Sequence, residues 1–285
     1  MWLADKWKDY EVLDTAAGEK LERWGDYILI RPDPQVIWNT KRKLPEWKRA
    51  NGIYHRSDKG GGSWTFDGLP EVWSVSYGDL TFRLKPMGFK HTGLFPEQAV
   101  NWDAMRALIR GAGRPVRVLN LFAYTGAASI ACAKEGASVV HVDSSKGMVT
   151  WAKENAAASG LKDAPVRYLV DDCLKFVERE IRRGNTYDGI VMDPPSYGRG
   201  PSGEIWKLED SLYPFLTRVA RLLSATPLFV FVNSYTTGLQ PLTIANLMSL
   251  AFGDEKKGTV QAGEIGLPVR NGLILPCGAC GRMTF

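Results

Sequence analysis

Apolar segments alternate with helical patterns after residue 114, and this alternation limits the possible folds more than any other feature. Near-continuous apolar stretches occur at 116–122, 138–143, 166–172, 187–193 and 227–234. Helical patterns lie between them, at 126–136, 147–160, 172–183 and 205–224. Apolar strands separated by helices are typical of a parallel sheet that is covered on both faces. Right-handed crossovers then predict an α/β, doubly wound domain.

The first part of the chain has a different composition. Seven of the ten tryptophans lie within the first 73 residues. Strand-like runs occur at 26–31, 71–77 and 80–86, and a Gly-Asp turn joins the last two into a predicted hairpin. We therefore expect a small β-rich domain over residues 1–88 and a doubly wound domain over residues 89–285.

Overall composition is that of a soluble globular protein, with 45% hydrophobic and 24% charged residues. No apolar run approaches the ~20 residues that a membrane-spanning helix needs. The N-terminus lacks the apolar core of a signal peptide. We therefore expect a cytoplasmic protein that does not associate with membranes. The sequence indicates no particular oligomeric state.

The cysteines and histidines do not form a metal-binding pattern. Cys277 and Cys280 make one C-x-x-C, whereas His55, His91 and His141 are scattered. A structural zinc site needs four ligands, which usually come as two such pairs. We therefore expect reduced cysteines and no metal.

Acidic and small residues follow the predicted strands. Gly126 comes after the first strand, Asp143 after the second, Asp171 and Asp172 after the third, and Asp193 after the fourth. Ligands of doubly wound sheets bind at these carboxyl ends. A carboxylate after the second strand can accept hydrogen bonds from both hydroxyls of a ribose, and one after the third strand from an adenine amino group. Each aspartate taken alone can equally be a cap or turn residue.

The loop after the first strand lacks the glycine pattern of dinucleotide-binding enzymes. Only Gly126 stands where G-x-G-x-x-G would be expected, so nothing there is suited to cradle a pyrophosphate. A nucleoside ligand without phosphates fits this loop better. S-adenosylmethionine is the common ligand of that kind.

Several motifs resemble those of one enzyme family. The strings "TGLFPEQ", "LNLFAYTG", "HVDSSK" and "DPPSYGRG" are similar to those of class I S-adenosylmethionine-dependent methyltransferases of the bacterial large-subunit rRNA type. The resemblance covers the chain from about residue 88 to the C-terminus. It implies a seven-stranded sheet, with an antiparallel last strand within 278–285, and a segment over 90–98 that closes over the cofactor.

The resemblance also implies which residues contact S-adenosylmethionine. They are Phe95, Gln98, Asn120, Phe122, Ala123, Tyr124, Thr125, Gly126, Asp143, Ser144, Asp172, Cys173 and Asp193.

The "DPPSY" segment is the predicted catalytic loop. In enzymes that methylate amino groups, rigid prolines hold an acid and a carbonyl near the transferred methyl, and an aromatic ring stacks on a flipped-out base. Asp193, the Pro194 carbonyl and Tyr197 are the candidates for these roles. Here Ser196 displaces the aromatic residue by one position, which weakens the argument for amino methylation.

Methylation of carbon 5 in a pyrimidine requires a cysteine nucleophile. Related carbon-5 enzymes carry that cysteine just after the fifth strand, where this chain has Asn233, Ser234 and Tyr235. This difference counts against carbon-5 chemistry. Cys277 is an alternative nucleophile, with a buried turn cysteine as the simpler interpretation.

Residues 31–60 carry eight basic residues against three acidic ones, with Trp38, Trp47 and Tyr54 interleaved. Basic side chains neutralise phosphates and aromatic rings stack on bases, so the pattern is compatible with RNA binding. Lys41, Arg42 and Lys43 are the predicted phosphate contacts, and Arg199 is a further candidate. The alternative is an ordinary solvated face whose tryptophans fill a small core.

We therefore expect an S-adenosylmethionine-dependent methyltransferase that modifies a base of ribosomal RNA. Two alternatives remain from the sequence. One is a methyltransferase of the same fold that acts on a small molecule or a protein. The other is a cofactor-binding RNA assembly factor without activity.

Overall fold

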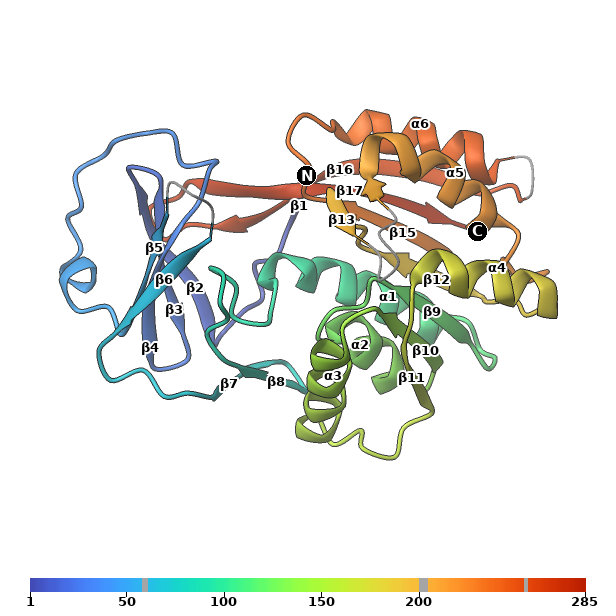
Figure 1. Cartoon of the computed structure of the whole chain (residues 1–285), viewed down its shortest axis with the longest axis horizontal. Coiled ribbons are helices and arrows are strands. Elements are labelled where there is room, and N and C mark those ends of the chain that lie inside the picture. The colour runs from blue at the N-terminus through green and yellow to red at the C-terminus, as the bar shows by residue number, and fades with distance from the viewer. Residues whose placement is uncertain (58–60, 200–204, 254–255) are drawn as a thin grey trace. The chain divides into compact units, whose positions relative to one another are not determined.

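The computed structural model describes residues 1–57, 61–199, 205–253 and 256–285. It divides into two compact units (Figure 1). The larger unit contains residues 100–264 and 278–285 with Met1, and the smaller unit contains residues 2–99 and 265–277. The expected division after residue 88 differs from this one, because residues 89–99 and the late segment 265–277 belong to the smaller unit.

Within the described residues the large sheet has eight strands in the order β1-β16-β17-β15-β12-β9-β10-β11, one more than the resemblance implies because β1 (Trp2–Leu3) pairs with β16. Its other strands are β9 (Arg117–Leu121), β10 (Ser138–Asp143), β11 (Val166–Val170), β12 (Gly189–Met192), β15 (Phe229–Ser234), β16 (Thr259–Pro268) and β17 (Ile274–Thr284). Neighbouring strands from β15 to β11 are parallel, whereas β17 runs antiparallel to β15. The predicted doubly wound sheet is confirmed, and its antiparallel last strand begins earlier than residue 278.

Two groups of helices cover this sheet. The helices are α1 (Ala99–Gly111), α2 (Ala127–Lys134), α3 (Lys146–Ala158), α4 (Cys173–Arg183), α5 (Leu208–Ala220) and α6 (Pro241–Phe252). Phe176, Phe215 and Phe252 of α4, α5 and α6 belong to one buried cluster with the strands. The helices α2 and α3 lie on the other side of the sheet from α5 and α6 (Figure 1). None of the described helices is long and apolar enough to cross a membrane.

Capping residues fix where several of these helices begin and end. The Ser145 hydroxyl accepts a hydrogen bond from the Met148 amide at the start of α3, and Asp172 accepts one from the Lys175 amide at the start of α4. Such side chains satisfy amides that have no partner within the helix. Gly184 ends α4 with a φ of 66°, a conformation that glycine adopts without strain. Both α3 and α4 therefore start three residues after the preceding strand ends, at the edge where a ligand would bind.

The smaller unit is built from strands. A five-stranded sheet has the order β2-β3-β4-β5-β6, and β7 pairs with β8 as a hairpin. The strands are β2 (Tyr10–Ala16), β3 (Glu19–Trp24), β4 (Tyr27–Pro32), β5 (Gly52–Arg56), β6 (Gly62–Phe66), β7 (Trp73–Tyr77) and β8 (Leu80–Leu84). A short strand, β1 (Trp2–Leu3), pairs with residues 265 and 266 of β16. The predicted hairpin and the strand at 26–31 are therefore present.

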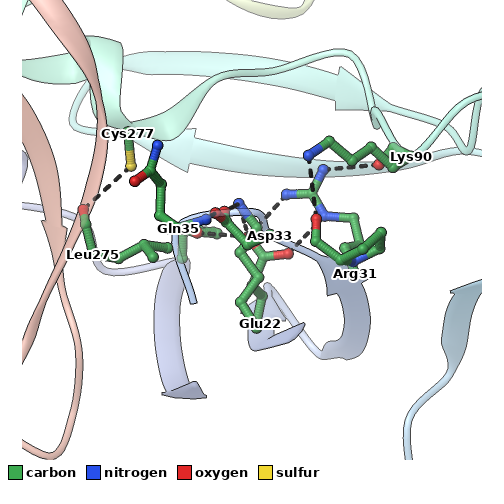
Figure 2. A network of polar contacts seen from close by, with 10 residues as sticks. Glu22, Arg31, Asp33, Gln35, Lys90, Leu275 and Cys277 are labelled. Atoms are coloured by element: carbon green, nitrogen blue, oxygen red, sulfur yellow. Dashed lines mark hydrogen bonds and ion pairs between the residues drawn. The ribbon is translucent and has the colours of Figure 1, made fainter. Parts of the chain in front are cut away.

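A buried network of charged and polar side chains joins β3 and β4 (Figure 2). The Arg31 guanidinium donates to both carboxylate oxygens of Glu22, at 2.6 and 2.8 Å, and the Tyr10 hydroxyl donates to the same carboxylate at 2.7 Å. The remaining Arg31 nitrogen donates to the Lys90 carbonyl at 3.0 Å. Both Glu22 and Arg31 are buried. Arg31 is therefore a core residue and does not contribute to an exposed basic face.

Candidate active site

The carboxyl ends of four parallel strands meet at one edge of the larger unit's sheet. The order β12-β9-β10-β11 brings together the residues that directly follow these strands. The chain goes from β9 to β10 on one side and reaches β12 on the other side of β9, so the strand order reverses between β9 and β12. Ligands of doubly wound sheets bind at such a reversal. This edge is the candidate site.

The loop after β9 has a strained backbone. Phe122 and Tyr124 have φ values of 54° and 50°, which residues with a side chain rarely adopt, and Gly126 has a φ of 85°. A Cβ atom on Gly126 would lie 2.8 Å from the Cβ of Ala152 in α3, closer than real Cβ contacts. Strain of this kind persists where the surroundings hold the chain, and it is concentrated at functional sites. Residue 126 must therefore be glycine for this loop to pack against α3.

Asp143 connects the loop after β9 to the start of α3. One carboxylate oxygen accepts a hydrogen bond from the Tyr124 amide at 2.8 Å, and the other accepts one from the Ser145 amide at 2.8 Å. Burial raises the pKa of Asp143, while the hydrogen bonds from Ser145 and Tyr124 act in the opposite direction. Ser144, the next residue, is exposed. The Asp143 carboxylate is thus held at the strand end by backbone donors on two sides.

The third strand end is held by its own contacts. Asp172 caps α4 by accepting from the Lys175 amide at 2.8 Å, and Asp171 forms an ion pair with Arg179. Cys173 is buried, and its sulfur accepts a hydrogen bond from the Phe122 amide at 3.3 Å. Burial raises the pKa of the Cys173 thiol, which keeps it protonated. Cys173 therefore links the first and third loops as a neutral thiol.

The loop after β12 presents Tyr197 on the surface. Its side chain is 51% exposed, whereas Pro194 is buried and Asp193 is half-buried. Tyr197 lies in a short strand, β13 (Tyr197–Arg199), which pairs with β14 (Ile205–Lys207). This placement suits an aromatic ring that stacks on a substrate.

Two residues that the sequence analysis did not single out hold this loop. The Trp206 indole donates to the Pro195 carbonyl at 2.7 Å, and the Ser196 and Thr236 hydroxyls lie 2.6 Å apart. Trp206 follows the loop by only a few residues and belongs to a predicted helical pattern, so no sequence signal distinguished it. Pro194 and Pro195 have no backbone N–H to donate, so the contacts of Trp206 and Thr236 hold the loop instead of backbone hydrogen bonds from the prolines.

Other predicted cofactor residues differ in their surroundings. Asn120 is buried, and its amide nitrogen donates to Ser129 at 2.9 Å. Ala123 and Thr125 are buried parts of the strained loop. Phe95 and Gln98 belong to the smaller unit, where the Gln98 amide donates to the Phe95 carbonyl at 3.1 Å. The roles of all these residues at the cofactor remain predictions.

The predicted phosphate contacts are exposed on the smaller unit. Lys41, Arg42 and Lys43 all lie on its surface. Arg42 is also engaged within the protein, because it pairs with Glu19 at 2.5 Å and lies over the Trp47 ring at 4.2 Å. Lys59 and the Arg199 side chain lie outside the described residues.

The two cysteines of the C-x-x-C do not face each other. Both lie on β17, and residues three apart on a strand point to opposite faces. All four cysteines are free, and the described residues contain no group of three potential metal ligands. Burial raises the pKa of the Cys277 thiol well above its ordinary value, and a thiol is a weaker nucleophile than a thiolate. Cys277 is half-buried and lies in a strand rather than a turn, and its raised pKa favours a structural cysteine over a nucleophile.

Comparison with known proteins supports a single family. A family model described as S-adenosylmethionine-dependent methyltransferase matches residues 31–241. The ribosomal RNA large subunit methyltransferase K/L of Shewanella frigidimarina (strain NCIMB 400) is 34% identical over 241 residues, which are 81% of this chain and 32% of that protein. The protein of the same name from Shewanella baltica (strain OS155 / ATCC BAA-1091) is 33% identical over 262 residues, 85% of this chain and 34% of the relative. This chain thus spans about a third of the length of these curated relatives.

Solved structures show the same architecture. The crystal structure of the SAM-dependent methyltransferase from Agrobacterium tumefaciens has a TM-score of 0.91 and 35% sequence identity, over 99% of this chain and 95% of that one. The crystal structure of SMU.776 complexed with SAH has a TM-score of 0.79 and 19% identity, over 98% of this chain and 76% of that one. The second similarity shows that the fold is shared.

Proposed function

Because this chain belongs to the family of S-adenosylmethionine-dependent methyltransferases, we propose that it transfers the cofactor's methyl group to a base of large-subunit ribosomal RNA. The observation that carries the substrate assignment is the loop after β12, where an exposed aromatic ring follows an acid and two prolines. The names of the curated relatives support RNA as the substrate. Stacking on an aromatic side chain is the usual way in which proteins hold an unpaired base.

The residues at the carboxyl ends of β9, β10 and β11 fit this cofactor. S-adenosylmethionine, when bound, supplies an electrophilic sulfonium methyl group. The Asp143 carboxylate is suited to accept hydrogen bonds from ribose hydroxyls, and the backbone of the strained loop at 122–126 allows a ligand to approach closely. The single glycine in this loop suits a ligand without a pyrophosphate.

Positioning is the main catalytic task that we assign to the loop after β12. A strong electrophile needs little activation, so in-line placement of the acceptor atom accounts for most of the required effect. Asp193 and the Pro194 carbonyl would accept hydrogen bonds from the base, and Tyr197 would stack on it. The contacts of Trp206 and Thr236 with the loop keep these groups in place.

The distribution of a labelled methyl group distinguishes this proposal from its alternatives. The purified protein and labelled cofactor would be incubated with one substrate at a time. The substrates are unmodified large-subunit rRNA, small-subunit rRNA and an RNA-free cell extract. We expect label in the large-subunit rRNA. Label in protein or small molecules would favour a methyltransferase of the same fold that acts on a protein or a small molecule. Cofactor binding without transfer to any of them would favour an assembly factor.

Replacing Tyr197 with alanine should leave cofactor affinity within about twofold of the wild type. Turnover on RNA should fall by roughly 5- to 150-fold, because stacking on a base contributes ~1–3 kcal/mol. Tyr213→Ala is the matched control, since Tyr213 of α5 is 44% exposed. Calorimetry and single-turnover transfer would provide the two measurements. A joint loss of cofactor binding and turnover would show that Tyr197 is structural.

Replacing Lys41 and Lys43 with alanine should weaken RNA binding without affecting cofactor binding. Arg42 is left in place because it pairs with Glu19 and packs on Trp47. Each lost phosphate contact should flatten the slope of log affinity against log salt by about one. The control pair, Lys162→Ala with Lys257→Ala, removes two exposed charges from the larger unit. Equal slopes for wild type and Lys41/Lys43 variant would make this region an ordinary solvated face.

A further inference from the structure

A chain of hydrogen bonds leads from the half-buried Arg282 of β17 through two buried asparagines, in α1 and β15, to the end of β12. The Nε and Nη2 atoms of Arg282 donate to the Oδ1 atom of Asn101, at 2.9 and 2.6 Å. The Nδ2 atom of Asn101 donates to the Oδ1 atom of Asn233 at 2.9 Å. The Nδ2 atom of Asn233 donates in turn to the Met192 carbonyl at 3.5 Å. Asn101 and Asn233 are 0% and 2% exposed.

The chain of hydrogen bonds has one donor-to-acceptor direction, and Arg282 sets it. A guanidinium has donors and no acceptor, so the Asn101 oxygen must face Arg282. The Asn101 amide nitrogen must then face Asn233, and the Asn233 amide nitrogen must face Met192. Arg282 thus donates to Asn101, Asn101 to Asn233, and Asn233 to the Met192 carbonyl. Successive hydrogen bonds of this kind polarise and strengthen one another in a buried environment.

The carbonyl at the end of the chain belongs to the last peptide unit before the catalytic loop. Its other group, the Asp193 amide, donates to the Leu121 carbonyl of β9 at 3.4 Å. Pro194 and Pro195 have no amide hydrogen, so neither can continue the ladder. Asn233 lies one residue beyond Val232, which is the partner of Met192 in the pairing of β12 with β15. The Met192–Asp193 peptide is therefore held by Leu121 on one side and by Asn233 on the other.

We propose that Arg282, Asn101 and Asn233 are positioning residues that orient the catalytic loop through the Met192 carbonyl. This inference rests on the proposed function, because it assigns substrate placement to that loop. None of the three residues needs to touch the substrate or the cofactor. Their contribution is to fix the direction in which Asp193 and the prolines leave the sheet. The contact between Asn233 and the Met192 carbonyl, at 3.5 Å, is the longest in this hydrogen-bond chain.

Asn101→Asp tests the direction of the chain while preserving its shape. The new carboxylate still accepts from Arg282, through a stronger charge-assisted hydrogen bond. It offers only an acceptor to Asn233, however, so the Asn233 amide must turn and point its oxygen at the Met192 carbonyl. We expect kcat to fall at least tenfold, with the cofactor dissociation constant within twofold of wild type and the melting temperature within a few degrees of wild type, because one weak buried hydrogen bond is lost while another is strengthened. Asn233→Asp places an acceptor against the same carbonyl and should have a similar effect on kcat.

A second readout is independent of activity on RNA. The Asp193 amide is the single exchangeable backbone hydrogen within residues 193–195, and its hydrogen exchange should become at least tenfold faster in Asn101→Asp. The control is Asn271→Asp, because the exposed Asn271 side chain accepts from the Leu273 amide and an aspartate can do the same. It should leave all the measurements unchanged.

The outcomes separate this inference from the proposed function. Wild-type kcat and wild-type Asp193 exchange in Asn101→Asp would overturn the positioning role. So would a fall in kcat that only parallels losses of cofactor affinity and melting temperature. Accelerated exchange in a protein that transfers no methyl to RNA would support the positioning role and refute the substrate assignment.

Discussion

Glu22→Gln is expected to lower the free energy of unfolding by about 3–5 kcal/mol, because it removes the carboxylate that pairs directly with the buried Arg31 guanidinium. Arg31 and Glu22 are joined by two hydrogen bonds between buried groups, and the Tyr10 hydroxyl completes the set. A neutral amide would preserve the shape of this contact but not its charge. Urea denaturation followed by tryptophan fluorescence provides the measurement.

Glu19→Gln is the matched control for this experiment. It removes a neighbouring carboxylate of β3 that pairs with Arg42, where the two side chains are 27% and 39% exposed. Exposed ion pairs contribute at most about 1 kcal/mol. Equal losses of stability in the two variants would show that the buried Glu22–Arg31 pair contributes no more to the free energy of unfolding than the exposed Glu19–Arg42 pair.

Acid should act on the same pair. Burial raises the pKa of Glu22, but the charges of Arg31 and Lys20 and the hydrogen bonds outweigh that effect and lower the pKa from 4.5 to about 2. A carboxyl with a lowered folded-state pKa stabilises the protein above its unfolded-state value, and this contribution is lost as the pH falls. The wild type should therefore lose stability between pH 4.5 and about 2 through this residue. The Glu22→Gln variant should lack this part of the pH dependence.

Asp143→Asn should weaken cofactor binding by roughly ten- to hundredfold, which corresponds to ~1.5–3 kcal/mol. Both carboxylate oxygens accept from backbone amides, and an amide side chain turns a donor toward one of them. The substitution also removes the charge that strengthens hydrogen bonds to ribose hydroxyls. Calorimetric titration with S-adenosylmethionine provides the measurement.

Asp188→Asn is the matched control for Asp143. Asp188 is also buried and accepts from a backbone amide, that of Arg117, at 2.8 Å, but it precedes β12 and so lies at the opposite edge of the sheet. It should lower stability without a specific loss of cofactor affinity. Unchanged affinity in Asp143→Asn would remove this residue from the cofactor site.

The larger unit could be predicted from its sequence because local signals agree with its final packing. The apolar run at 138–143 is β10 with identical bounds, and Asp172 caps α4 where the third strand ends. Strand periodicity, caps and glycines act over a few residues, so they can be recognised without knowing the fold. The same signals placed Asp143 and Asp193 at one edge of the sheet.

The smaller unit was less predictable because its pairing depends on distant partners. Residues 19–24, "EKLERW", are mostly charged and carry no strand signal, yet they form β3, which pairs with β2 and β4 and places Glu22 beside Arg31 of the next strand. Arg31 was counted with the basic residues of 31–60 because the sequence does not show that Glu22 is its buried partner. The segment 265–277 joins this unit although it lies far along the chain. Likewise, Asn101 and Arg282 meet only in the folded protein, so no motif could connect them.

The position of the transferred methyl group tests the central claim most directly. Unmodified large-subunit rRNA would be incubated with the protein and isotopically labelled S-adenosylmethionine, digested to nucleosides and examined by mass spectrometry. We expect one labelled nucleoside in which the methyl group is on the base, with the signal strongly reduced for Tyr197→Ala. Label on the ribose, or no labelled nucleoside from a protein that binds the cofactor, would contradict the assignment as an RNA base methyltransferase.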